Sequence, residues 1–152
     1  MNEMPMRPHN EDELLTLLGL MVREAGHVEL RLRVVAMGLA DSPHGELITA
    51  GQSVSQLLDM CKALATEVET SDRRETLAQL TRRCRSAFSR RDQYVHGAWT
   101  IDGETSEWMT IRSRRNQRVP TFAPLSAEEL GELVRELNSL SGDIMTWLIN
   151  AS

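Results

Sequence analysis

Aromatic residues and cysteines are scarce in this sequence. Aromatic residues make up 4% of the chain, and the apolar content comes mainly from leucine and other aliphatic residues, which suits helices packed on helices. The two cysteines, Cys61 and Cys84, lie within apolar helical patterns, and no Cys-x-x-Cys motif or cluster of histidine and cysteine is present. We therefore expect two reduced core residues, no disulfide, no metal site and no cofactor.

Long apolar runs are also missing. No run approaches the roughly 18 consecutive apolar residues that a membrane span needs. The first ten residues contain prolines and polar side chains but no apolar segment followed by a cleavage site, so they do not resemble a secretory signal. The sequence therefore predicts a cytoplasmic protein with no membrane-bound part.

Positive charge is concentrated in one part of the chain, and nearly all of it is arginine. The formal net charge is −5. Residues 73–118 hold eleven arginines and five acidic residues, a local balance of +6 that leaves −11 for the rest of the chain. A basic middle in an acidic chain favours a local anionic partner such as RNA or a nucleotide. The alternative is that these arginines form a solvated helix face.

Helical periodicity begins near the N-terminus. Residues 1–9 contain two prolines and predict a flexible arm, and residues 10–152 predict a single domain. Asn10 and Glu13 have the spacing of a capping box. Apolar residues then recur every three or four positions, which predicts a long helix with a broad stripe, as in a bundle or a dimer. The seam is formed by Leu14, Leu18, Met21, Ala25, Val28, Leu32, Val35 and Leu39.

Two further helices are predicted before the middle of the chain. Turn residues at 41–45 separate the first helix from a second over residues 46–67, which Gly51 interrupts. A third helix runs from Asp72 to Gly97. We expect Gly97 to adopt the left-handed conformation that ends many helices.

The apolar period changes from helical to alternating after this glycine. Residues 99–101 and 108–112 predict two short strands that form a hairpin. Pro120 and Pro124 predict an irregular connector, and a Ser-x-x-Glu capping box then begins a last helix over residues 127–149. The predicted architecture is all-α: an up-and-down bundle of about four long helices, with a small β-hairpin inserted before the last helix.

The strongest candidate for chemistry lies at the end of the third predicted helix, where Arg91, Asp92 and His96 fall within six residues. Arg91 lies on the apolar seam, where a charge is costly unless it meets a partner or a wet cleft. An imidazole exchanges protons near neutral pH, and a guanidinium matches phosphate oxygens. These groups suit metal-free cleavage of RNA by its own 2′-hydroxyl, with His96 as general base or acid and Arg91 stabilising the phosphate. Asp92, one turn before His96, would orient the imidazole.

The segment Arg91-Asp92-x-x-x-His96 resembles the R-x4-6-H motif of the HEPN superfamily, which commonly has a polar residue directly after the arginine. HEPN proteins are small helical bundles, and many are metal-independent ribonucleases. The resemblance implies an endoribonuclease that acts as a homodimer, with two motifs lining one cleft. It also implies a toxin or defence component whose partner is an antitoxin or another regulatory protein.

Six further residues are candidates for binding the substrate. An aromatic ring beside an arginine offers a stacking surface and a hydroxyl, and an arginine run after the predicted hairpin would follow a phosphate backbone. Glu29 of the first helix, or Glu24 in its place, would face the same cleft and pair with Arg91. The six candidates are Glu29, Arg90, Tyr94, Arg112, Arg114 and Arg115.

Two other interpretations stay open at this point. In the first, the chain is a non-catalytic HEPN-like module that binds a nucleotide or RNA, or that dimerises. In the second, it is a purely structural helical protein. Arg91 would then pair with an acid from another helix, and His96 would cap the helix end, where a partly positive group is favourable.

Overall fold

The computed structural model describes residues 10–112 and 119–150, so the arm predicted at residues 1–9 lies outside the described residues. Five helices and three strands are present in this part of the chain, and none of its helices is both long and apolar enough to cross a membrane. The predominance of helix confirms the broad all-α prediction. In chain order the elements are α1 Glu11–Ala40, α2 Gly45–Thr49, α3 Val54–Val68, α4 Ser71–Val95, β1 Ala98–Ile101, β2 Trp108–Arg112, β3 Thr121–Pro124 and α5 Ala127–Ile149.

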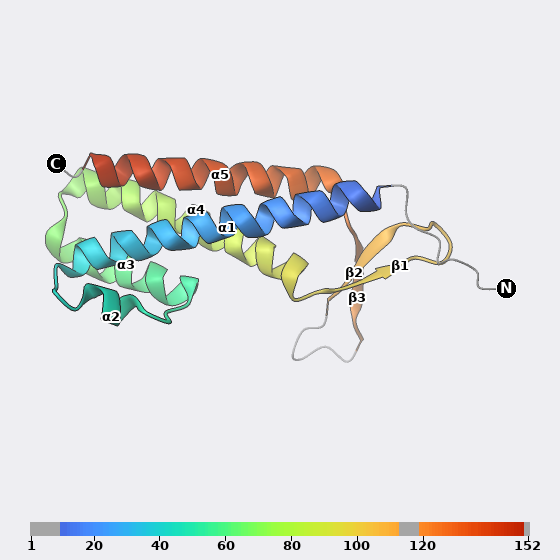
Figure 1. Cartoon of the computed structure of the whole chain (residues 1–152), viewed down its shortest axis with the longest axis horizontal. Helices are drawn as coiled ribbons and strands as arrows, with labels where there is room; N and C mark the ends of the chain where they lie inside the picture. The colour runs from blue at the N-terminus through green and yellow to red at the C-terminus, as the bar shows by residue number, and fades with distance from the viewer. Residues whose placement is uncertain (1–9, 113–118, 151–152) are drawn as a thin grey trace.

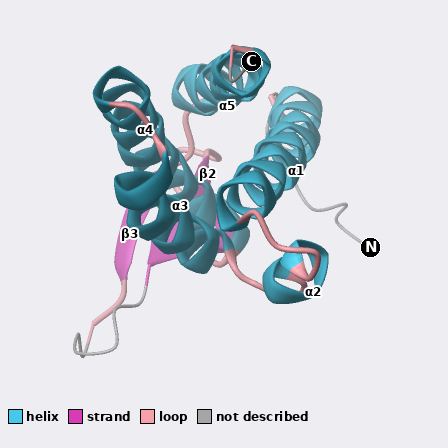
Figure 2. Ribbon diagram, turned by 90° about the vertical axis from the view of Figure 1, so that its left-hand side faces the viewer, coloured by secondary structure: helices cyan, strands magenta, loops and turns pink. Residues whose placement is uncertain are grey.

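The four longer helices, α1, α3, α4 and α5, lie lengthwise beside one another (Figures 1 and 2). Their buried apolar side chains belong to one core. Side-chain contacts give the direction of α1 relative to α5. The carboxylate of Glu24 on α1 accepts a hydrogen bond from Asn138 on α5. Further along both helices, Arg31 donates to the carbonyl oxygen of Ser141. The residue numbers rise together, so α1 and α5 run in the same direction.

Helix α4 runs against both of its neighbours. Arg83 contacts Glu136 on α5, whereas the earlier Arg73 contacts the later Trp147. The contacts with α3 follow the same descending order, so α3 is parallel to α1. This corrects the predicted up-and-down order, in which successive long helices alternate in direction. The α4 to α3 contacts are Arg74 with Thr66 and Arg85 with Asp59.

The segment around α2 explains why α3 runs parallel to α1. It carries the chain back beside α1 before α3 begins (Figure 1). Gly51 has a φ of 71°, a left-handed conformation that glycine adopts without steric cost. Ser53 then caps α3: its hydroxyl accepts from the backbone N–H of Gln56 at 3.3 Å, and the Gln56 side chain accepts from the Ser53 N–H at 2.8 Å. The second predicted helix, over residues 46–67, is therefore two separate helices, and the interruption expected at Gly51 falls between them.

A three-stranded antiparallel sheet in the order β1-β2-β3 lies at one end of the helices (Figure 1). The predicted hairpin forms its first two strands, with Trp99 opposite Thr110. β3 replaces the irregular connector that we predicted. This strand ends at Pro124, and a missing backbone N–H is tolerated there because β3 is an edge strand.

Two tryptophans join the sheet to the helices. The rings of Trp99 and Trp108 meet edge to face, with centroids 5.9 Å apart, an arrangement that aromatic pairs favour. Both rings also pack against the apolar core. Trp99 Nε1 donates to the carbonyl oxygen of Tyr94 at 3.2 Å, which ties β1 to the last turn of α4.

The helix ends and the cysteines test further predictions. Ser126 caps α5 by accepting from the backbone N–H of Glu129 at 3.2 Å, whereas Asn10 makes no side-chain cap hydrogen bond to α1. The predicted capping box at the start of α1 is therefore wrong. Cys61 and Cys84 are buried and unpaired, and burial raises the pKa of each thiol to about 12. Both remain protonated thiols near neutral pH, as expected of unreactive core cysteines.

Candidate functional site

The last turn of α4 positions the predicted catalytic residues. The helix ends at Val95, and the backbone N–H of His96 donates to the carbonyl oxygen of Asp92 at 2.9 Å. A Cβ atom on Gly97 would lie 2.6 Å from the carbonyl oxygen of Gln93. Gly97 is thus required by a close backbone approach. Its φ is not positive, so the left-handed cap that we predicted there is wrong.

Arg91 is half-buried at this end of the helix. Its side chain is 29% exposed, and Nη1 donates to Oδ1 of Asp92 at 2.9 Å. The Nε atom is buried and has no hydrogen-bond acceptor among the described residues. A buried N–H of a charged group is costly to leave unpaired. A bound acceptor such as a phosphate oxygen would relieve that cost.

His96 is exposed, and its imidazole makes no hydrogen bond or ion pair within residues 10–112 and 119–150. The carboxylate of Asp92 turns to Arg91 instead. The predicted Asp92–His96 side-chain pair is therefore not formed. The guanidinium of the adjacent Arg91 is a permanent cation, and its charged hydrogen bond holds the Asp92 carboxylate.

Arg90 and Tyr94 lie on another face of α4. Arg90 Nη2 donates to the carbonyl oxygen of Glu129 on α5 at 3.3 Å. Residues 90 and 94 share one side of the helix, and residues 92 and 96 share a side roughly 200° around the axis. The two predicted binding residues are therefore not brought next to His96. They line a separate cavity of about 470 Å³ with Gln93, Ala123, Pro124, Glu129 and Glu132.

The predicted pairing of Glu29 with Arg91 is wrong. Glu29 is ion-paired within α1, with 3.4 Å between its Oε1 atom and Nη2 of Arg33. The local i,i+4 spacing satisfies the carboxylate without a contact from another helix. The other three candidates give no test of their predicted role, because the side chain of Arg112 and the whole of Arg114 and Arg115 lie outside the described residues.

Glu24 is a buried carboxylate that the sequence did not reveal as such. It is 4% exposed and accepts from Arg23 Nε at 2.9 Å and from Asn138 at 3.2 Å. His27 Nδ1 lies 3.5 Å away. The hydrogen bond from Arg23 lowers the pKa of Glu24, against the opposing effect of burial, and Asn138 lowers it further. The i,i+3 spacing from Met21 on the core seam was the available signal, but the partner on α5 was not visible in the sequence.

We predict that Glu24→Gln weakens the fold and flattens its response to acid. A folded pKa below the ordinary value of 4.5 means that the carboxylate stabilises the protein above pH 4.5 and loses this effect as pH falls through the folded pKa. Losing the charged hydrogen bonds should cost about 1–3 kcal/mol at neutral pH. Urea unfolding from pH 7 to pH 3 measures both effects. Glu29→Gln is the matched control, because that carboxylate is 41% exposed and should change little; equal losses for both variants would contradict the role of Glu24.

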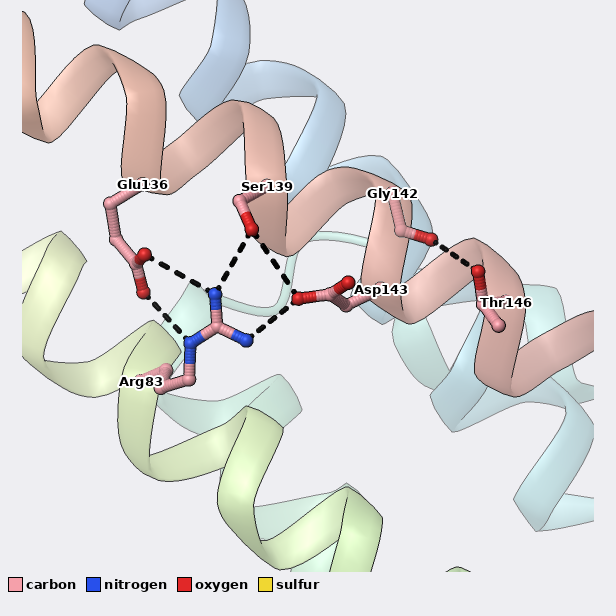
Figure 3. Close-up of polar contacts among 6 residues, drawn as sticks. All are labelled: Arg83, Glu136, Ser139, Gly142, Asp143 and Thr146. Atoms are coloured by element: carbon pink, nitrogen blue, oxygen red, sulfur yellow. Dashed lines mark hydrogen bonds and ion pairs between the residues drawn. The ribbon is translucent and has the colours of Figure 1, made fainter.

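Arg83 is the second residue whose contacts were not predicted from the sequence. Its guanidinium joins α4 to α5, with Nε 2.9 Å from Oε1 of Glu136 and Nη1 2.7 Å from Oδ2 of Asp143 (Figure 3). Nη2 also donates to Oε2 of Glu136 at 3.2 Å, and Ser139 Oγ accepts a fourth hydrogen bond at 3.3 Å. The hydrogen bonds to Glu136 and then Asp143 raise the pKa of Arg83. Part of the basic middle of the chain is therefore engaged in packing the helices.

No group of three or more histidine, cysteine, aspartate or glutamate side chains within the described part of the chain is arranged to hold a metal ion. Comparison with protein-family models, with curated proteins and with solved structures gave no match for this chain.

Proposed function

We propose that this protein is a metal-independent endoribonuclease of HEPN type, with Arg91 and His96 as its catalytic residues. The observation that carries the proposal is the state of these two side chains. His96 offers an accessible imidazole just past the end of α4. Five residues earlier, Arg91 has a buried Nε donor without an acceptor among the described residues.

The proposed reaction uses the 2′-hydroxyl of RNA as the nucleophile. His96 accepts the hydroxyl proton, the 2′-oxygen bonds to phosphorus, and the bond from phosphorus to the 5′-oxygen breaks. The products are a 2′,3′-cyclic phosphate and a 5′-hydroxyl, whose proton comes from an imidazolium. Arg91 donates to the non-bridging oxygens, where charge grows in the transition state. In a homodimer, the second copy of His96 would be the proton donor.

The role of Asp92 in this proposal differs from the role that its spacing suggested. Its carboxylate holds the Arg91 guanidinium at 2.9 Å. It would therefore orient the arginine and leave the imidazole free to approach the sugar. Asp92→Asn would then reduce the stabilisation of the phosphate more than it changes proton transfer by His96.

A second copy of the chain is the proposed partner of α1. Four large apolar side chains of α1 are between 46% and 59% exposed, outside the core seam. Covering such a surface is favourable because it removes apolar area from water. Our proposal also includes a cytoplasmic location and regulation by an antitoxin or similar protein. The exposed residues are Leu15, Val22, Leu30 and Val34.

A non-catalytic RNA- or nucleotide-binding module is the second candidate. The observation in its favour is that no described side chain holds the His96 imidazole in one orientation. A general base normally depends on such a partner to fix its tautomer. Arg91 would still bind a phosphate in this case, whereas His96 would contribute little beyond contact.

Incubation of the purified protein with RNA in EDTA distinguishes the two candidates. Cleavage that yields 2′,3′-cyclic phosphate ends supports the ribonuclease. Binding of RNA without cleavage supports the module.

A further inference from the structure

One face of α4 carries a continuous row of solvent-facing side chains. Its members are spaced by three or four residues, so they lie along one side of the helix. All are exposed except Ala78, which is half-buried. The row begins among arginines and ends at the proposed catalytic histidine. It consists of Arg74, Ala78, Arg82, Arg85, Ser89, Asp92 and His96.

The first half of this row forms one wall of a groove between α3 and α4. The groove has a volume of about 670 Å³, larger than the cavity of about 440 Å³ beside Arg83 on the other side of α4. Four cationic and two acidic side chains line it, for a formal charge of +2. The lining residues that carry charge are Lys62, Arg74, Arg82, Arg85, Asp72 and Glu75.

Three of the four cations of the groove are weakly engaged, whereas the fourth, Arg85, forms an ion pair with Asp59. Lys62 has no ion pair with another described residue, and Arg74 donates to a backbone carbonyl, that of Thr66, at 3.2 Å. Arg82 and Glu75 lie 3.7 Å apart and are both about two-thirds exposed. Such exposed pairs contribute little. A ligand anion can therefore replace weak local partners.

The groove is unsuited to an amphipathic helix, because such a partner needs apolar side chains to cover. None of the large exposed apolar side chains within the described ranges belongs to the groove. Its apolar lining residues Leu58, Ala65 and Leu77 are already buried, and the fourth, Ala78, is half-buried. Charge and hydroxyl groups remain as the means of recognition, and three of the four cations are arginines, which match phosphate oxygens.

We infer that the α3–α4 groove binds the phosphodiester backbone of single-stranded RNA and directs the strand along α4 to His96. This inference rests on the proposed ribonuclease function. Residues 74 and 96 are 22 positions apart, which corresponds to about 33 Å along the helix. A stacked strand rises about 3.4 Å per nucleotide, so roughly ten nucleotides span the distance. A trinucleotide bound at His96 does not reach Lys62 or Arg74.

The test compares an RNA of roughly twelve nucleotides with a trinucleotide. Lys62→Glu and Arg74→Glu each reverse one charge of the groove. We expect each variant to raise the KM for the longer RNA roughly three- to tenfold at moderate salt. We also expect the dependence of log KM on log salt to become shallower by about 0.7 for each phosphate that the groove no longer neutralises. The preference for the longer RNA over the trinucleotide should shrink accordingly.

Arg135→Glu is the matched control, since it makes the same change of charge at an exposed position on α5 outside the groove. If the groove variants change the length preference no more than Arg135→Glu, the inference is overturned and the ribonuclease function stands. If the wild type cleaves nothing, fluorescence anisotropy with the longer RNA still tests the groove. If Lys62→Glu then weakens RNA binding and Arg135→Glu does not, the groove is an RNA-binding site even though the protein is not a ribonuclease. Tighter binding of polyglutamate than of RNA would identify an acidic protein segment as the occupant and reject the inference.

Discussion

His96→Ala is expected to abolish metal-free cleavage of RNA and leave the fold intact. Loss of a general acid or base typically lowers a rate by about 10²–10⁴-fold. The imidazole is exposed and bonds to no described side chain, so the midpoint of thermal unfolding should match that of the wild type. Initial rates on a labelled RNA in EDTA, together with melting curves followed by circular dichroism, measure both quantities.

His44→Ala is the control for this variant, because it removes another exposed imidazole at a distance along the chain, in the turn before α2. It should retain the full rate. Equal cleavage by wild type and His96→Ala would place the activity elsewhere or in a contaminant. Arg91→Lys adds a second check: it keeps the charge but loses the planar fork that grips a phosphate, so its rate should fall while RNA binding persists.

Gly97→Ala is expected to have the second largest effect, on both stability and activity. The new Cβ would lie 2.6 Å from the carbonyl oxygen of Gln93, a backbone atom that cannot turn away as a flexible side chain can. The junction between α4 and β1 must shift, at a cost of about 1–3 kcal/mol. Because His96 is the adjacent residue, its imidazole moves with the junction. Urea unfolding and the cleavage assay should therefore both report a loss.

Gly142→Ala provides the comparison for this substitution. A Cβ at Gly142, within α5, meets nothing within 4 Å, and alanine in an exposed helix position stabilises by about 0.5–1 kcal/mol. The two glycine variants should therefore change stability in opposite directions. A neutral Gly97→Ala variant would show that the junction between α4 and β1 relaxes at no cost.

The helices that the sequence located best are those with a long, uninterrupted apolar period. The last helix was predicted at residues 127–149, and α5 spans Ala127–Ile149. The sequence marked Gly51 as an interruption of the helix over residues 46–67. It did not show that α2 and α3 are separate helices, which follows from the conformation of Gly51 and the reciprocal cap at Ser53. Local periodicity also contains no information on helix direction, so the parallel orientation of α1 and α3 could not be predicted from it.

Local sequence patterns also failed to predict part of the sheet and part of the candidate site. β3 follows Pro120 and ends at Pro124, and it forms because β2 offers a free edge, which is a property of the fold and not of the local sequence. The seam on α4 did place Arg91 half inside the protein. It did not reveal that the Asp92 carboxylate would pair with Arg91. Helical spacing allows this carboxylate more than one partner and does not decide among them. Partners on distant elements, such as Asn138 for Glu24, were equally invisible.

The parallel packing of α1 against α5 has a consequence for synthesis on the ribosome. Glu24 and Asn138 are 114 positions apart in the chain, yet they share a hydrogen bond. The side of α1 that faces α5 stays uncovered until the residues of α5 have left the exit tunnel, and closing so long a loop is slow. The growing chain thus presents an open apolar surface until α5 is made. The core between α1 and α5 is therefore completed only after α5 has been synthesised.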